Sequence, residues 1–91
     1  MNELARKIPE RVRSEILLGA DDPINNVVDS PANKHMQTLF AIYYEYLYPF
    51  ASNKDLHCWR CRGRVLHFFR GIYGDLLVLE KESQLLKLLR P

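Results

Sequence analysis

The chain is poor in several residue types and patterns that would point to a specific class of protein. It has only two cysteines and four glycines in 91 residues, and the glycines are scattered rather than gathered in a phosphate-binding loop. No apolar run approaches the roughly 20 residues that a membrane-spanning helix needs. No serine, histidine and acidic residue form a recognisable catalytic motif. We therefore expect no membrane segment, no enzymatic activity and no bound cofactor.

What the chain does have is the composition of one folded domain over residues 1–91. Hydrophobic residues make up 47% and aromatic residues 11% of the chain, which supplies enough apolar area to offset the chain entropy lost on folding. The first residues are charged, at Glu3, Arg6 and Lys7, and lack the apolar stretch of a secretion signal. We therefore expect a cytoplasmic protein whose two cysteines are free thiols.

Apolar residues recur at helical spacing in four segments, which predicts an all-α fold, a small bundle of three to four helices. Pro9 suits the first turn of the first helix, and Gly19 offers its end. Ser30 followed by Pro31 predicts a cap and first turn for the second helix. The predicted helices cover residues of about 9–18, 31–48, 54–73 and 76–90.

The remaining boundaries come from smaller signals. Asp22 followed by Pro23 predicts a short helical turn between the first two helices, and Asn53 predicts the cap of the third. Gly71 and Gly74 predict a break before the fourth. Residues 76–79 are compatible with either the start of that helix or a brief extended segment.

Cys58 and Cys61 are separated by two residues, the spacing with which two thiolates bind one zinc ion, and His57 lies beside them. A structural zinc needs four ligands, however, and this pair supplies two. On a helix, both cysteines also belong to a narrow apolar stripe, which consists of Cys58, Cys61, Val65, Phe68 and Ile72. We therefore expect core cysteines and no metal. The alternatives are a zinc site on Cys58, Cys61 and His57, or a redox dithiol, which typically follows a strand.

The chain carries a formal net charge of only +2, but its positive charge is concentrated in one segment. Residues 56–74 contain four arginines and no acidic residue: Arg60, Arg62, Arg64 and Arg70. Such a cluster is typical of a surface that binds the phosphates of nucleic acid. The alternative is that these arginines are solvated or form ion pairs with the acidic residues of the segment 1–30.

The last predicted helix has more leucines than one buried face requires. An apolar surface wider than the rest of a small domain can cover favours association with another copy or with a partner protein. The residues that we expect at such an interface are Leu77, Leu85, Leu88 and Leu89.

Two segments, C-W-R-C-R-G-R-V-L-H-F-F-R (residues 58–70) and H-M-Q-T-L-F-A-I-Y-Y-E-Y-L (residues 35–47), carry a resemblance to known sequences. They resemble small proteins of unknown activity that phages and mobile elements of gut bacteria encode. The resemblance implies a phage or mobile-element setting, and it brings no catalytic residues. Our leading hypothesis is a non-enzymatic helical interaction protein that self-associates as a homo-oligomer or binds a protein partner. Nucleic-acid binding is the alternative, and a small zinc-binding domain is the third.

Overall fold

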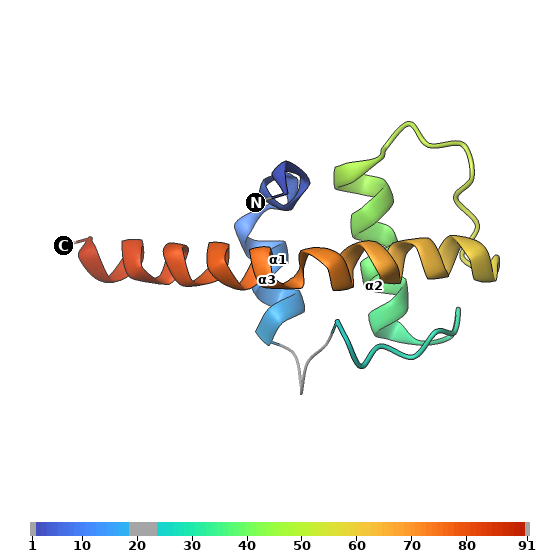
Figure 1. Ribbon diagram of the computed structural model, residues 1–91, viewed down its shortest axis with the longest axis horizontal. Coiled ribbons are helices and arrows are strands. Elements are labelled where there is room, and N and C mark those ends of the chain that lie inside the picture. The colour runs from blue at the N-terminus through green and yellow to red at the C-terminus, as the bar shows by residue number, and fades with distance from the viewer. Residues whose placement is uncertain (1, 19–23, 91) are drawn as a thin grey trace.

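A computed structural model describes residues 2–18 and 24–90, and these residues form helices and no strand (Figure 1). The predicted all-α fold, a bundle of three to four helices, is therefore confirmed. The expected end at Gly19 and the expected start at Asp22 and Pro23 lie outside the described residues. In chain order the elements are a 3-10 helix η1 (Glu3–Lys7), α1 (Glu10–Leu18), α2 (Lys34–Ile42), a π-helical segment η2 (Tyr43–Leu47) and α3 (Trp59–Leu89).

Helix α3 determines the shape of the molecule. Its 31 residues extend along the long axis, and α1 and α2 lie across it (Figure 1). At 1.5 Å per residue this helix is about 46 Å long, which is close to the 47 Å length of the whole molecule. The C-terminal end of α3 extends beyond α1, so its last turns lie outside the packed body of the protein (Figure 1).

The continuity of α3 corrects the prediction of two helices over 54–73 and 76–90. The helix runs through Gly71 and Gly74 without a break, and residues 76–79 are helical rather than extended. The reason is that Ile72, Leu76 and Leu79 are all buried along one side of the helix. Each glycine costs about 1 kcal/mol relative to alanine in a helix interior, and burial of these three apolar side chains outweighs that cost.

Helix caps account for the other differences in boundaries. The side chain of Asn33, not that of Ser30, accepts the Met36 N–H at 3.0 Å, so α2 begins after residue 33. Cys58, not Asn53, caps α3. Asn2 caps η1, which the apolar periodicity did not predict because the helix is only five residues long.

The core lies where η1, α1 and α2 meet the first two thirds of α3. Tyr43 illustrates its aromatic side: the ring centroid lies 4.8 Å from that of Tyr44 and 5.4 Å from that of Phe68, and burial raises the pKa of its hydroxyl. The largest fully buried side chains are Phe69, Ile8, Ile24, Met36, Leu39, Leu76 and Val65.

A buried ion pair connects α1 to α3. The Arg13 Nε donates to Glu80 Oε1 at 3.0 Å, and its guanidinium also donates to Ser83 Oγ at 2.6 Å. Ser14 donates its hydroxyl to the same carboxylate at 2.8 Å. Burial alone would raise the pKa of Glu80, but the hydrogen bonds from Ser14 and Arg13 and the charge of Arg13 outweigh burial, so this pKa is lowered. This network fixes α1 on α3 immediately before α3 leaves the body.

Candidate interaction surfaces of helix α3

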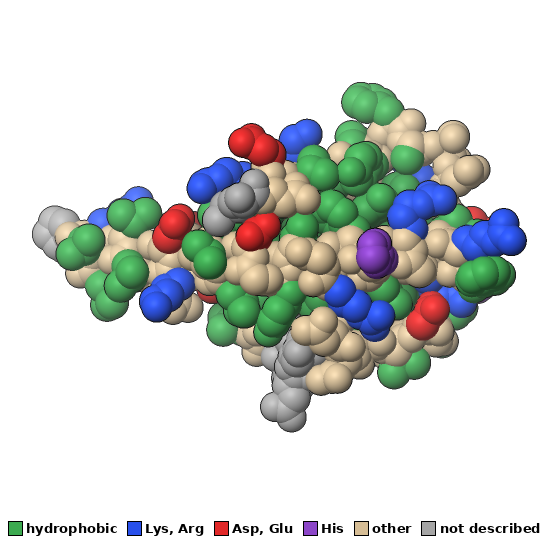
Figure 2. Space-filling model, in the orientation of Figure 1, with side chains coloured by type: hydrophobic (Ala, Val, Ile, Leu, Met, Phe, Trp, Pro, Cys, Tyr) green, Lys and Arg blue, Asp and Glu red, His purple; other side chains and the backbone are tan. Residues whose placement is uncertain are grey.

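The C-terminal part of α3, from Leu77 to Leu89, carries an apolar surface that the described residues leave uncovered. We call it the leucine face, and Figure 2 shows hydrophobic side chains along this end of the molecule. The predicted interface residues Leu77, Leu85, Leu88 and Leu89 all belong to it, together with Val78. Their exposed fractions rise toward the end of the helix, from 44% at Leu77 and 51% at Leu85 to 80% at Leu88 and Leu89.

The leucine face has the spacing of a coiled-coil seam. Val78, Lys81, Leu85 and Leu88 follow one another at steps of three, four and three residues, which is the spacing that keeps side chains facing a partner helix. Toward the N-terminus the same steps continue through Gly74 and Gly71. A Cβ atom added at either glycine would meet nothing within 4 Å. Packing within the chain therefore does not require glycine at these two positions.

Leu86 is exposed for a different reason. It lies seven residues, or about two turns, after the buried Leu79, and therefore on the side of α3 that faces the core earlier in the helix. Leu86 is 59% exposed because it lies beyond Leu79, the last buried apolar residue of α3. The apolar surface thus extends around much of the projecting helix, on both the leucine face and the side of Leu86.

The N-terminal half of α3 has a basic outer surface, which we call the basic face and define by Arg60, Arg64, His67 and Arg70. All four are exposed, and within the described part of the chain none forms an ion pair. Trp59 begins the same helix with 66% of its surface exposed, and the Arg60 guanidinium lies 5.3 Å from the centre of its ring. Three of the four predicted arginines are therefore together and free to contact an anion.

Arg62 is the exception among the predicted nucleic-acid-binding residues. It is buried, its Nε lies 2.6 Å from Asp29 Oδ1, and it donates a second hydrogen bond to the Leu56 carbonyl at 2.9 Å. Arg62 therefore matches the alternative prediction, ion pairing with the acidic residues of segment 1–30, and does not belong to the basic face. The helical position explains its burial, because Val65 and Leu66, three and four residues later on the same side of the helix, are also buried.

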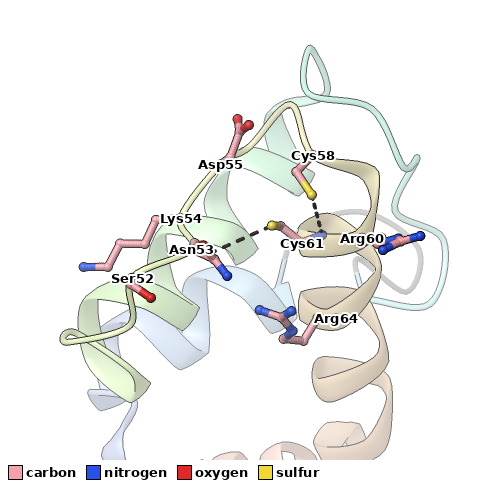
Figure 3. A pocket seen from close by; sticks show the side chains of 8 residues that line it. All are labelled: Ser52, Asn53, Lys54, Asp55, Cys58, Arg60, Cys61 and Arg64. Carbon is pink, nitrogen blue, oxygen red and sulfur yellow. Dashed lines mark hydrogen bonds between the residues drawn. The ribbon is translucent and has the colours of Figure 1, made fainter.

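The two cysteines lie at the first turn of α3, beside an open hollow of about 620 Å³ (Figure 3). Cys61 is buried and Cys58 is half-buried against the core, so the expected core position holds fully for Cys61 and partly for Cys58. Cys58 Sγ accepts the Cys61 N–H at 3.4 Å, and Cys61 Sγ lies 3.9 Å from the Asn53 carbonyl oxygen. The hollow is lined by Ser52, Asn53, Lys54, Asp55, Cys58, Arg60, Cys61 and Arg64.

The pKa values of the two thiols are shifted in opposite directions. The neighbouring Cys61 side chain and the Cys61 backbone N–H lower the pKa of Cys58. The neighbouring Cys58 side chain and burial raise the pKa of Cys61, whose thiol donates its hydrogen bond to the Asn53 carbonyl. The His57 imidazole does not complete a metal site here, since no group of three or more histidine, cysteine or acidic side chains suited to a metal occurs among residues 2–18 and 24–90.

Two features of these surfaces were missed by sequence reasoning. One is the seam through Val78 and Lys81, although the steps of three and four residues were readable in the sequence. The other is the ion pair of Arg13 with Glu80, which are 67 residues apart, and no local pattern indicates such a pairing.

Comparisons with protein-family models, with curated proteins and with solved structures give no match to this chain. The resemblance to phage and mobile-element proteins and the cytoplasmic location therefore stay predictions. None of the described helices is both long enough and apolar enough to cross a membrane. Functional inference rests on the surfaces described above.

Proposed function

We propose that this protein is a helical interaction protein that self-associates through the leucine face of α3. The observation that carries the proposal is the projecting end of α3, where Leu85, Leu88 and Leu89 are 51–80% exposed on a helix that leaves the body. Burial of a leucine side chain contributes about 1.5–3 kcal/mol. Several such side chains on one seam can therefore offset the entropy lost when two chains associate.

A second copy of the chain fits this surface because its seam is self-complementary. If two α3 helices pair antiparallel at the level of Ser83, Val78 of one copy meets Leu88 of the other, and Leu77 meets Leu89. Lys81 then lies opposite Leu85 and within one turn of Glu82 of the other copy, where the opposite charges attract each other. The paired helices thus bury their apolar residues and place the one seam lysine beside an acid.

Charge favours this antiparallel orientation over a parallel one. In a parallel pair, Lys81 would lie opposite Lys81, and the two basic faces would lie side by side. Like charges in direct opposition destabilise an interface. An antiparallel pair instead places the two bodies, with their unpaired Arg60 and Arg64, at opposite ends.

Sedimentation equilibrium over a range of concentrations tests self-association. We expect the native chain to form dimers and the double variant Val78→Glu with Leu88→Glu to be monomeric, because these two positions meet across the antiparallel pair and the variant would place carboxylates opposite each other. Val28 and Phe50 supply the matched control, since they are 60% and 98% exposed outside α3. Val28→Glu with Phe50→Glu adds the same charge and should leave the dimer intact. A native chain that stays monomeric at every concentration contradicts the proposal.

A second candidate function is binding of nucleic acid by the basic face. The observation that favours it is that Arg60, Arg64 and Arg70 are exposed on the same helix and have no acidic partner among the described residues. Arginine gives charge-assisted hydrogen bonds to phosphate, and the exposed Trp59 ring offers a stacking surface for a base.

Titration of duplex and single-stranded DNA at several salt concentrations tests this candidate. Each phosphate contact contributes about 0.9 to the slope of log affinity against log salt for duplex DNA. We expect Arg60→Gln with Arg64→Gln to reduce that slope by about two contacts. Arg11 and Lys34, which are exposed on other helices, supply a control double variant with the same loss of charge. Equal effects of the two double variants, or no binding at low salt, would exclude a specific basic face.

A further inference from the structure

The N-terminus of α3 holds a second site that neither proposal uses, the pair Cys58 and Cys61. Cys58 is the cap residue of the helix and Cys61 its third residue. Side chains at these two positions approach each other, as they do in the capping box. Here Cys58 Sγ accepts the Cys61 N–H at 3.4 Å, and Cys61 Sγ lies 3.9 Å from the Asn53 carbonyl oxygen that precedes the same turn. The two sulfur atoms therefore share the first turn of one helix.

The two thiols also differ in accessibility. Cys58 is half-buried at the edge of the hollow, whereas Cys61 is buried beneath it (Figure 3). The helix N-terminus stabilises negative charge on the sulfur that caps it. An accessible sulfur that favours the thiolate therefore lies next to a less accessible sulfur that holds its proton. These are the properties required of a nucleophilic thiol, here Cys58, which attacks a disulfide, and of a resolving thiol, here Cys61, which releases the mixed disulfide.

The charges around the hollow define the kind of molecule that fits it. Arg64 extends toward Asn53 and the cysteines (Figure 3). Lys54 and Arg60 also line the hollow, but their charged groups point away from the cysteines: the Lys54 ammonium donates to the Pro49 carbonyl at 2.7 Å, and the Arg60 guanidinium lies 5.3 Å from the centre of the Trp59 ring. Asp55 is the one acidic side chain in the lining, and it lies beside Cys58. The lining thus carries three cationic groups against one carboxylate, and it favours a small anionic molecule over a neutral or cationic one.

We propose that Cys58 and Cys61 form a reversible redox dithiol that exchanges with a small anionic disulfide, of the class of glutathione disulfide. The thiolate of Cys58 attacks one sulfur of the small disulfide and forms a mixed disulfide, and one small thiolate leaves. Cys61 then loses its proton to water and attacks Cys58 Sγ, which releases the second small thiolate and closes the Cys58–Cys61 disulfide. The protein dithiol loses two electrons, and the small disulfide accepts them to become two thiols. A coil segment rather than a strand precedes Cys58, so the site depends on the helix cap alone.

The test is equilibration of the full chain with mixtures of reduced and oxidised glutathione, followed by acid quenching, alkylation of free thiols and mass spectrometry. We expect the native chain to reach the intramolecular disulfide without retaining glutathione. Cys61→Ala should stop at the mixed disulfide on Cys58, and Cys58→Ala should leave Cys61 reduced because that thiol is buried. The helical content of each variant is measured by circular dichroism. If a variant does not fold, the native chain alone tests the proposal: the intramolecular Cys58–Cys61 disulfide supports it, and a retained mixed disulfide contradicts it.

Charge recognition has its own readout. Arg64→Ala should slow oxidation by glutathione disulfide several-fold and leave oxidation by an uncharged hydroxyethyl disulfide unchanged. Arg70→Ala removes the same charge from α3 outside the lining of the hollow, and it should affect neither rate.

Three results would overturn the proposal. The first is a native chain that accumulates the mixed disulfide and never closes the ring. The second is a Cys58 that reacts no faster in the folded chain than in urea. The third is a purified chain that holds stoichiometric zinc on both cysteines and resists alkylation until the metal is chelated.

Discussion

The two halves of α3 belong to one continuous helix, yet they relate to the rest of the chain in opposite ways. Residues 59–79 bury one side against η1, α1 and α2 and turn a basic face to solvent. Residues 80–89 contribute no buried apolar side chain, and four of them are exposed leucines. The first segment contains all three glycines of the helix and the second contains none, so the greater burial of the first comes from packing and not from helix propensity. The first segment stabilises the fold, and the second leaves its leucines exposed.

The largest expected effects are on stability in the packed half. Phe69 is fully buried, whereas Leu88 is 80% exposed. We expect Phe69→Ala to lower the free energy of unfolding by about 3–5 kcal/mol because it leaves a cavity in the core. Leu88→Ala should change it by less than about 0.5 kcal/mol in the monomer. Urea denaturation at low protein concentration measures both, and similar losses in the two variants would mean that the end of α3 is packed after all.

The two ion pairs that α1 forms with residues 80–89 offer a second comparison, because one lies where the packed part of α3 ends and the other lies two turns further along. Arg13→Ala leaves Glu80 buried without its cation, and we expect a loss of about 3 kcal/mol. Lys87→Ala removes the exposed pair with Glu10, in which both side chains are about half-exposed or more, and should cost less than about 1 kcal/mol. Chemical denaturation of the two variants provides the measurement. The interpretation of the Arg13 network as a fixed contact fails if both losses are small.

Acid should weaken the same network. The pKa of Glu80 is lower in the folded chain than in the unfolded chain. The unfolded state therefore binds the proton more readily, and stability from Glu80 is present above the unfolded pKa and is lost as pH falls through the folded pKa. Glu80→Gln should remove this part of the pH dependence, which denaturation midpoints between neutral and acidic pH would reveal. Glu82→Gln, an exposed change on the same helix, is the control and should leave the curve as it is.

The smallest expected effect separates the two orientations of the dimer. Gly74 is exposed in mid-helix with open space around an added Cβ, so Gly74→Ala should stabilise the monomer by about 1 kcal/mol. In the antiparallel pair the seam ends before Gly74, and the dissociation constant should not change. A parallel pair would continue through Gly74 and Gly71. Weakened dimerisation of Gly74→Ala in sedimentation experiments would therefore favour the parallel arrangement.

Local patterns in the sequence predicted the fold class and most of the exposed surface. The alternation of three and four residues correctly assigned Cys61, Val65 and Ile72 to the core. The prediction of a helix break at Gly71 and Gly74 was wrong. Buried apolar residues before and after these glycines in the sequence maintain a helix that glycine disfavours. Arg62 was expected either to bind nucleic acid or to pair with an acidic residue of segment 1–30, and it pairs with Asp29. The two residues are 33 positions apart in sequence, so no local pattern identifies Asp29 as the partner.

The length of helix α3 would also determine the dimensions of the proposed dimer. The antiparallel pair would overlap over residues 77–89, about 20 Å of helix, so a dimer of chains 47 Å long should have a maximum dimension of about 75 Å. At 1.5 Å per residue, the cysteine pairs would then lie about 70 Å apart along the axis, and the centres of the two basic faces about 53 Å apart. A particle of this form holds two equivalent sites at a fixed separation. Two copies could therefore bridge anionic groups that are too far apart for one chain to reach.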